Sequence, residues 1–221
     1  MYRSLLQKPY QQQERILVPT ERMKQEAAAY LDVDESRIVV WPRGVDTEMW
    51  HPVGPQEKQA YTAYPWYKGR PIAVYFGRVT DEKNIRPFLE LELPDMHKVV
   101  IGDGNSKEAY KSRFKDTHFL GSKFGDDLAS HIRWSDAFVF LSRHDTFGQV
   151  VNEAGASGVP TVAIKGTSGP GELIQHGING ILIDDESDLQ NGLLSALNID
   201  RKRCAEYVRS HYSWDTSAEI L

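Results

Sequence analysis

Residues 137–164 read AFVFLSRHDTFGQVVNEAGASGVPTVAI and contain the pattern that decides the fold. Two short apolar runs, at 137–142 and 159–164, are typical of strands that are buried on both faces. Between them, residues 148–156 have the apolar spacing of a helix that packs on a sheet. A strand, a helix and a second strand in this order predict a βαβ unit with parallel strands.

The same alternation continues on both sides of this stretch. Further strands are expected at 15–19, 37–41, 71–76, 97–102, 117–121 and 179–183. Helices are expected after Thr20 and at 84–91, 106–114, 125–132 and 187–197. The sequence therefore predicts an α/β fold in which helices cover both faces of a parallel sheet.

Residues 42–70 interrupt this alternation. They contain several prolines and glycines without clear periodicity, so we expect a linker or a surface excursion there. The piece before them offers two strands and one helix, which is too little to bury a core unaided. Residues 1–24 carry five basic groups against two acidic ones, which suits a solvated helix or, alternatively, a surface that docks a partner or an anionic membrane.

Composition and charge exclude several classes of protein. The 221 residues include 26 basic and 31 acidic side chains, a net charge of −5, so no nucleic-acid-binding face is expected. The longest wholly apolar run, 137–141, is too short to span a membrane, and the first residues lack a secretory signal. The single cysteine, Cys204, excludes an internal disulfide, and the histidines do not fall at ligand spacing. We expect a cytoplasmic protein without a metal site.

Two cations follow the expected strand at 71–76. Arg78 comes directly after Gly77, and Lys83 lies five residues later at the entrance to a helix. Such a pair can clamp a diphosphate, because charge-assisted hydrogen bonds to phosphate are strong and a helix start favours negative charge. An ordinary solvated turn is the alternative.

The loop after 137–142 carries the acids of interest. Asp145 or Thr146 can cap the following helix, whose free amides then face the edge of the sheet where ligands bind. Glu153 lies inside that helix among apolar residues, and a partly buried carboxylate needs a partner such as a ligand hydroxyl. An acid placed for the helix dipole or paired with a buried base is the alternative.

Two glycine-rich turns have weaker signals. Gly102-Asp103-Gly104 allows a tight turn but lacks the third glycine of a dinucleotide fingerprint, so an ordinary strand-to-helix turn is the better interpretation. The turn at 165–172 suits contacts to an anion or a sugar, but it lacks the ending of a phosphate-binding loop. By itself it is as often a flexible turn.

In their order along the chain, these stretches resemble the carboxyl-terminal half of a glycosyltransferase of family 4, a group of retaining enzymes with the GT-B fold. The resemblance runs from about Arg15 to Trp214. It rests on ILVPTERMKQEAAAYLDVDESRIVVWPRGVDTEMWHP, VYFGRVTDEKN, VVIGDGN, HFLGSKFGDDLA, SDAFVFLSRHDTFGQVVNEAGASGVPTVA and NGILI. It implies a Rossmann-like doubly wound sheet as the nucleotide-sugar-binding domain, at 71–214. Residues 1–70 would be an interdomain segment with a remnant of the N-terminal domain, and 215–221 a truncated tail.

The resemblance also implies which residues hold the nucleotide diphosphate. Arg78 and Lys83, after Gly77, match the pair that holds the donor diphosphate and stabilises the leaving group as negative charge develops. Ser122 and Lys123 lie where the nucleotide base usually sits in the family.

Further donor contacts are implied around the two acids. Glu153 matches the second acid of the family's Glu, seven residues, Glu motif, which takes the ribose hydroxyls. Asp145 holds the place of the first acid, which touches the donor sugar. Thr146 and the amides of Phe147 and Gly148 belong to the same donor-binding group. Because Asp145 is one methylene shorter than glutamate, the identity of the sugar stays open.

The resemblance implies transfer of a hexose such as mannose from a nucleotide diphosphate sugar, GDP-mannose or UDP-hexose, to a glycan or lipid acceptor. No metal would be needed, and contact with a membrane would be at most peripheral. The family's N-terminal domain, with its acceptor site and catalytic histidine, has no counterpart in the sequence. The alternative is therefore a non-catalytic nucleotide-sugar-binding module that needs a separate acceptor-domain subunit.

Overall fold

The structure is a computed structural model that describes residues 2–54, 57, 59–143, 145–167 and 169–220. Pro55, His144 and Ser168, which the sequence places in irregular segments, lie outside the described residues. Within the part of the chain that is described, no helix is long and apolar enough to cross a membrane.

Six parallel strands form the central sheet, in the order β5-β4-β3-β6-β7-β8. They are β3 (Ile72–Phe76), β4 (His97–Ile101), β5 (Thr117–Gly121), β6 (Ala137–Phe140), β7 (Thr161–Ile164) and β8 (Gly180–Ile183). The chain runs outward from β3 to β5, returns to the centre, and runs the other way from β6 to β8. This is the doubly wound order, so the expected fold class is confirmed.

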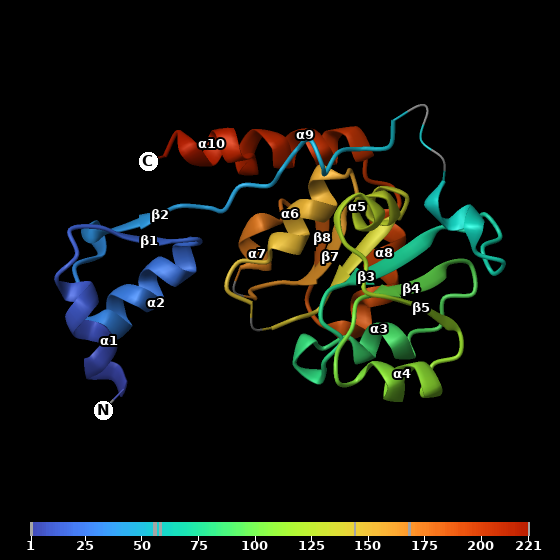
Figure 1. Cartoon of the computed structure of the whole chain (residues 1–221), viewed down its shortest axis with the longest axis horizontal. Coiled ribbons are helices and arrows are strands. Elements are labelled where there is room, and N and C mark those ends of the chain that lie inside the picture. Colours follow the sequence, from blue (N-terminus) through green and yellow to red (C-terminus); the bar gives the residue numbers. More distant parts are fainter. Residues whose placement is uncertain (1, 55–56, 58, 144, 168, 221) are drawn as a thin grey trace.

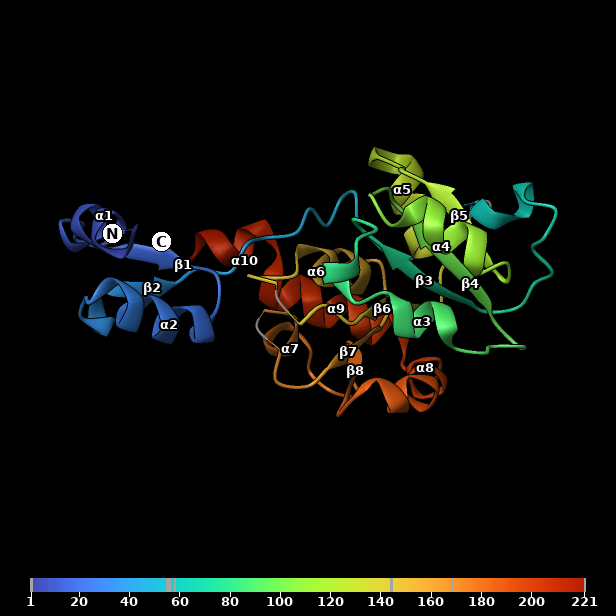
Figure 2. The same cartoon turned by 90° about the horizontal axis from the view of Figure 1, so that it is seen from below.

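Helices cover both faces of this sheet (Figures 1 and 2). Alternate residues of β3 point to opposite faces, so Ile72, Val74 and Phe76 belong to one buried cluster, whereas Ala73 and Tyr75 belong to another. The first face is packed by α5 (Gly125–Arg133), α6 (Gln149–Ala156), α7 (Pro170–Leu173) and α9 (Arg201–Tyr212). The second is packed by α3 (Arg86–Glu90), α4 (Lys107–Arg113) and α8 (Leu189–Ala196).

A smaller unit lies beside the main sheet (Figure 1). It consists of α1 (Tyr2–Gln11), β1 (Ile16–Val18), α2 (Glu21–Leu31) and β2 (Ile38–Val40). The two strands pair in parallel and bury a cluster of their own against α2. Thr20 starts α2, because its hydroxyl oxygen accepts a hydrogen bond from the Met23 amide. The expected strands and helix of this region are confirmed, and α1 lies within 1–24, where a solvated helix is one interpretation. Helices α7, α9 and α10 (Trp214–Ala218) are additional.

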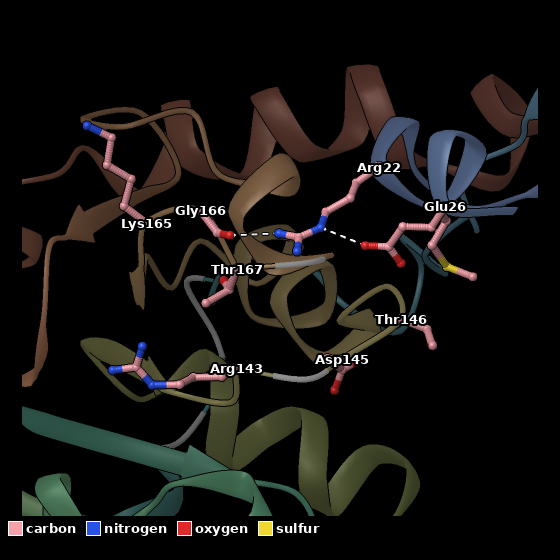
Figure 3. A pocket seen from close by; sticks show the side chains of 9 residues that line it. Arg22, Glu26, Arg143, Asp145, Thr146, Lys165, Gly166 and Thr167 are labelled. Carbon is pink, nitrogen blue, oxygen red and sulfur yellow. Dashed lines mark hydrogen bonds and ion pairs between the residues drawn. The ribbon is translucent and has the colours of Figure 1, made fainter. Parts of the chain in front are cut away.

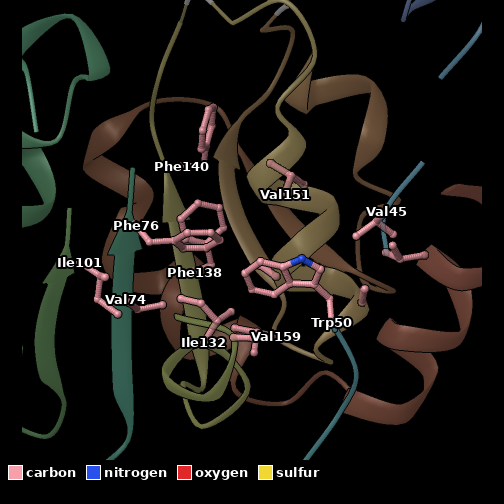
Figure 4. Packing of buried hydrophobic residues seen from close by; sticks show 14 of the residues in the cluster. Val45, Trp50, Val74, Phe76, Ile101, Ile132, Phe138, Phe140, Val151 and Val159 are labelled. Atoms are coloured by element: carbon pink, nitrogen blue, oxygen red, sulfur yellow. The ribbon is translucent and has the colours of Figure 1, made fainter. Parts of the chain in front are cut away.

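The described residues between 42 and 70 are irregular, as expected, apart from a short 3-10 helix at Ala60–Ala63, but they are not confined to the surface. Trp50 stacks on Phe76 with ring centroids 6.4 Å apart, and Val45 is buried in the same cluster (Figure 4). Tyr61 is fully buried and shares a hydrogen bond of 3.0 Å with the Ser135 hydroxyl. These buried side chains stand singly in segments without regular secondary structure, so they form no periodic pattern that would predict their burial from the sequence.

The C-terminal helices run back toward the smaller unit (Figure 1). The Trp41 indole donates a hydrogen bond to the Ser217 carbonyl oxygen at 2.9 Å, and its ring lies 6.4 Å from that of Trp214. A side chain on Gly44 would collide with Trp214, so glycine allows this close approach. These contacts join the smaller unit to α10.

Candidate functional site

The polar loops meet where the order of the sheet reverses. β3 and β6 are neighbours at the centre, and the chain leaves them toward opposite edges. The loop after β3 carries Arg78 and Lys83, and the loop after β6 leads to Asp145. Ligands of open α/β sheets bind in this crevice, outside the carboxyl ends of the strands. The structure thus brings the cations and this acid to one edge of the sheet.

Glycines allow the loops after β3 and β4 to lie against each other. Gly102 has a φ of +146°, and a Cβ there would overlap the carbonyl oxygen of Gly77. A Cβ on Gly104 would overlap that of Val79. The Val79 amide donates to the Asp103 carbonyl oxygen at 2.9 Å. The glycine-rich turn after β4 therefore serves close backbone packing, the interpretation that the sequence favours, and supports the loop that carries Arg78.

A cavity of about 310 Å³, which we call the β5–α6 pocket, extends from the loop after β5 to helix α6. It brings together five of the residues that the sequence singles out: Gly77, Arg78, Ser122, Lys123 and Glu153. The remaining lining residues are Phe76, Ile101, Gly102, Asp103, Phe124, Leu128 and Val150. Its lining therefore contains apolar, basic and acidic side chains.

The two cations of this pocket differ in how firmly they are held. The Arg78 side chain is 70% exposed and pairs with Glu82 at 3.1 Å. Exposed pairs of this kind contribute little free energy, so Arg78 is available for an anionic ligand. The Lys123 side chain is only 13% exposed and pairs with Asp127 at 2.9 Å. Lys123 is therefore fixed along α5, beside the pocket.

Glu153 is the mostly buried acid of the pocket. No hydrogen bond or ion pair with another described residue reaches its carboxylate, although the positive charge of Arg43 acts on it. Burial raises the pKa of Glu153 to about 7, and Arg43 opposes part of that rise. Because burying an unpartnered carboxylate is unfavourable, this residue has the character of a binding site that a ligand completes.

Lys83 and Asp145, neither of which lines this pocket, form an ion pair with each other. Lys83 Nζ lies 2.9 Å from one Asp145 carboxylate oxygen, with side chains 16% and 21% exposed. The other oxygen accepts hydrogen bonds from the amides of Gly148 at 3.0 Å and Phe147 at 3.4 Å. The N-cap position of α6 is Gly148, so the expected capping by Asp145 or Thr146 is wrong in its location. Asp145 instead satisfies the amides just ahead of the helix.

A second cavity of about 480 Å³, the α2 cleft, lies between the smaller unit and the loops after β6 and β7 (Figure 3). It is lined by Arg22, Met23, Glu26, Arg143, Asp145, Thr146, Lys165, Gly166 and Thr167. Arg22 donates to the Gly166 carbonyl oxygen at 2.9 Å, and the Glu172 carboxylate accepts from the Glu21 amide at 3.0 Å. The glycine-rich turn after β7 is thus the contact surface for α2.

The sequence analysis does not single out Phe124, Arg22 or Arg143, which the structure places in the two pockets. Phe124 directly follows Ser122 and Lys123, so extending that loop by one residue would have included it. Arg22 reaches its pocket only through the docking of α2, a contact between segments about 150 positions apart in the chain. A local pattern carries no signal for such a contact.

Comparisons with known proteins show the family to which the chain belongs. The family model described as "Glycosyl transferases group 1" matches residues 57–211, and the model described as "Glycosyltransferase Family 4" matches residues 1–49. A GDP-mannose-dependent alpha-mannosyltransferase of Corynebacterium glutamicum is 32% identical over 165 residues, 72% of this chain and 40% of that protein. A protein of the same name from Mycobacterium tuberculosis is 33% identical over 148 residues, 66% of this chain and 38% of that protein.

Solved structures share the fold. HepE of Anabaena, in complex with UDP-glucose, superposes with a TM-score of 0.79 at 16% identity, over 99% of this chain and 65% of that one. The chain spans about 40% of the length of the two relatives named above. The first family model nevertheless matches more than half of the chain, and its position agrees with the resemblance that the sequence motifs indicate. The chain therefore belongs to the family of glycosyl transferases group 1.

Proposed function

We propose that this chain is the donor-binding part of a retaining glycosyltransferase, which transfers a hexose from a nucleotide diphosphate sugar to a glycan or lipid acceptor. The observation that carries the proposal is the β5–α6 pocket, which joins Arg78, Glu153, Ser122 and Lys123 at the reversal point of the sheet. Mannose, carried by GDP, is the favoured hexose because the two named relatives are GDP-mannose-dependent. In this proposal residues 71–214 bind the donor.

The charges of the site suit such a transfer. When the bond between the anomeric carbon and the diphosphate breaks, negative charge develops on the phosphate oxygens. Arg78 and Lys83 would stabilise that charge, because preorganised cations act most strongly where charge forms. Glu153 would accept hydrogen bonds from the ribose hydroxyls, which supplies the partner that its carboxylate lacks among the described residues. Asp145 and Thr146, in the α2 cleft, would contact the sugar.

Isothermal titration of the chain with GDP, UDP, GDP-mannose and UDP-glucose tests the proposal. Micromolar binding of one nucleotide family without added metal is the expected result. Assays of donor hydrolysis, with and without a separately supplied N-terminal domain, then separate a catalytic role from a binding module. Absence of binding to every one of the four compounds would contradict the proposed donor site.

The variant Arg78→Ala is expected to weaken binding of the matching nucleoside diphosphate by about tenfold or more, because a charge-assisted contact to phosphate is lost. The same calorimetric titration measures this change. Arg86→Ala is the matched control, since Arg86 is also exposed and pairs with an acid four residues later, but lies outside both pockets. Equal affinities of the two variants would contradict the role of Arg78.

A further inference from the structure

Phe124 is an exposed aromatic side chain at the edge of the β5–α6 pocket. Its exposure is 80%, whereas the next of the exposed large apolar side chains among the described residues, Leu194, reaches 49%. A phenylalanine stabilises a fold when it is buried, so the exposed side chain of Phe124 contributes little to folding. Single exposed apolar residues are common, and the position of this one is what distinguishes it.

Two glycines set the backbone that presents Phe124. Gly121 ends β5 with a φ of +75°, and Gly125 starts α5 with a φ of +53°. A Cβ on either glycine would meet no atom within 4 Å, so close packing does not require them. They are needed for the left-handed backbone on either side of 122–124. The backbone angles of these two glycines therefore set the path of this short segment, which places Phe124 in the lining of the pocket.

The two ends of the β5–α6 pocket differ in chemical character. The loop after β5 supplies Phe124, and α5 adds Leu128, so this end has an apolar wall. Lys123 also lines this end, where its ammonium group pairs with Asp127 at 2.9 Å. Arg78 follows β3 and Glu153 lies on α6 after β6, so these two charged groups lie farther along the sheet. Strands β5 and β6 are three neighbours apart in the sheet, about 14 Å at the usual spacing. A flat apolar group therefore suits the β5 end, while ribose and phosphates suit the rest.

We propose that Phe124 is the platform on which the donor's nucleobase stacks, and that this stacking makes the site prefer a purine to a pyrimidine. The inference rests on the proposed donor site. Stacking between a base and an aromatic ring strengthens binding by roughly 5-fold to 150-fold per base. It grows with the overlapping ring area, which is larger for the two fused rings of guanine than for the single ring of uracil. Ser122 and Lys123 then border the edge of the base.

Titrations of the full chain with GDP, UDP and inorganic pyrophosphate test this role. Phe124→Ala is expected to weaken GDP binding by about fivefold or more, the lower end of the stacking range. UDP binding should weaken less, and pyrophosphate binding should not change. Phe124→Trp should retain GDP binding, and GDP should quench the fluorescence of the added tryptophan. Leu194→Ala, at an exposed apolar position on α8 outside the pocket, is the matched control and should behave as the unmodified chain.

Three results would overturn the inference. The first is unchanged GDP affinity in Phe124→Ala, with Arg78→Ala impaired, which would leave the donor site standing without a stacking role. The second is an equal loss of affinity for GDP and for pyrophosphate in Phe124→Ala, which would mean that Phe124 stabilises the loops and does not contact the base. The third is an equal loss for GDP and UDP, which would remove the purine preference. Absence of nucleotide binding by the unmodified chain would instead contradict the proposed function and this inference together.

Discussion

Lys83→Met is expected to reduce donor turnover by about a hundredfold or more and to weaken binding of the nucleoside diphosphate. Removing one preorganised group that stabilises developing negative charge typically has an effect of this size, about 3 kcal/mol. Lys83 is suited to that role because its side chain is only 16% exposed and its ammonium group already faces an anion, Asp145, at 2.9 Å. Release of nucleoside diphosphate from the nucleotide sugar measures turnover, and calorimetry measures affinity.

A double variant separates this role from a structural one. Lys83→Met leaves the mostly buried Asp145 carboxylate without its cation, which is expected to destabilise the fold. Lys83→Met with Asp145→Asn removes both charges and should recover most of the thermal stability. If turnover and nucleotide affinity recover with it, Lys83 serves only to neutralise Asp145, and the proposed contact with the diphosphate is wrong.

The arrangement around Asp145 has a consequence for the donor. Its carboxylate accepts hydrogen bonds from Lys83 and from the amides of Phe147 and Gly148. The family resemblance assigns these same groups to the donor. Aspartate readily accepts hydrogen bonds from amides a few residues later, because its side chain is short. A donor that uses these groups would have to exchange with Asp145.

The sheet could be predicted from the sequence because each strand is short, apolar and bounded by turns. β3 and β6 are buried on both faces, which gives continuous apolar runs. The position of the site follows from the same pattern, since ligands bind at the carboxyl ends of such strands. Arg78 and Glu153 could therefore be selected as candidates before the structure showed that both line the β5–α6 pocket.

Other features depend on contacts between segments far apart in the chain. Trp50 and Tyr61 enter the core from irregular chain, where no period reveals burial. The carboxylate of Glu172 holds the start of α2, although the two lie about 150 positions apart. The partner of Asp145 also required the structure, because Lys83 and Gly148 come from opposite sides of the reversal point. Sequence patterns specify elements, whereas these contacts arise from their assembly.

Glu153→Gln is expected to stabilise the fold at pH 8 by roughly 3 kcal/mol. Burial raises the pKa of Glu153 from its ordinary 4.5 to about 7. The folded chain therefore binds this proton more tightly than the unfolded chain, so its contribution to stability is full below pH 4.5 and is lost as the pH rises through 7. Each unit of pKa difference corresponds to about 1.4 kcal/mol. Glutamine carries no charge, so the gain should appear at pH 8 and vanish near pH 4, in thermal or urea unfolding.

The same substitution is expected to weaken GDP binding by about tenfold, because ribose hydroxyls lose a charged acceptor, while pyrophosphate binding stays unchanged. Glu186→Gln is the matched control: Glu186 pairs with Arg143 at 2.7 Å, which lowers its pKa, and lies outside both pockets. Its loss should reduce stability at pH 8 and leave GDP affinity intact. If Glu153 lowers the stability of the fold because it is placed to bind the ribose, Glu153→Gln must both stabilise the fold at pH 8 and weaken GDP binding. A stability gain without loss of GDP affinity would make Glu153 a buried acid with no ligand, and would remove the ribose contact from the proposed site.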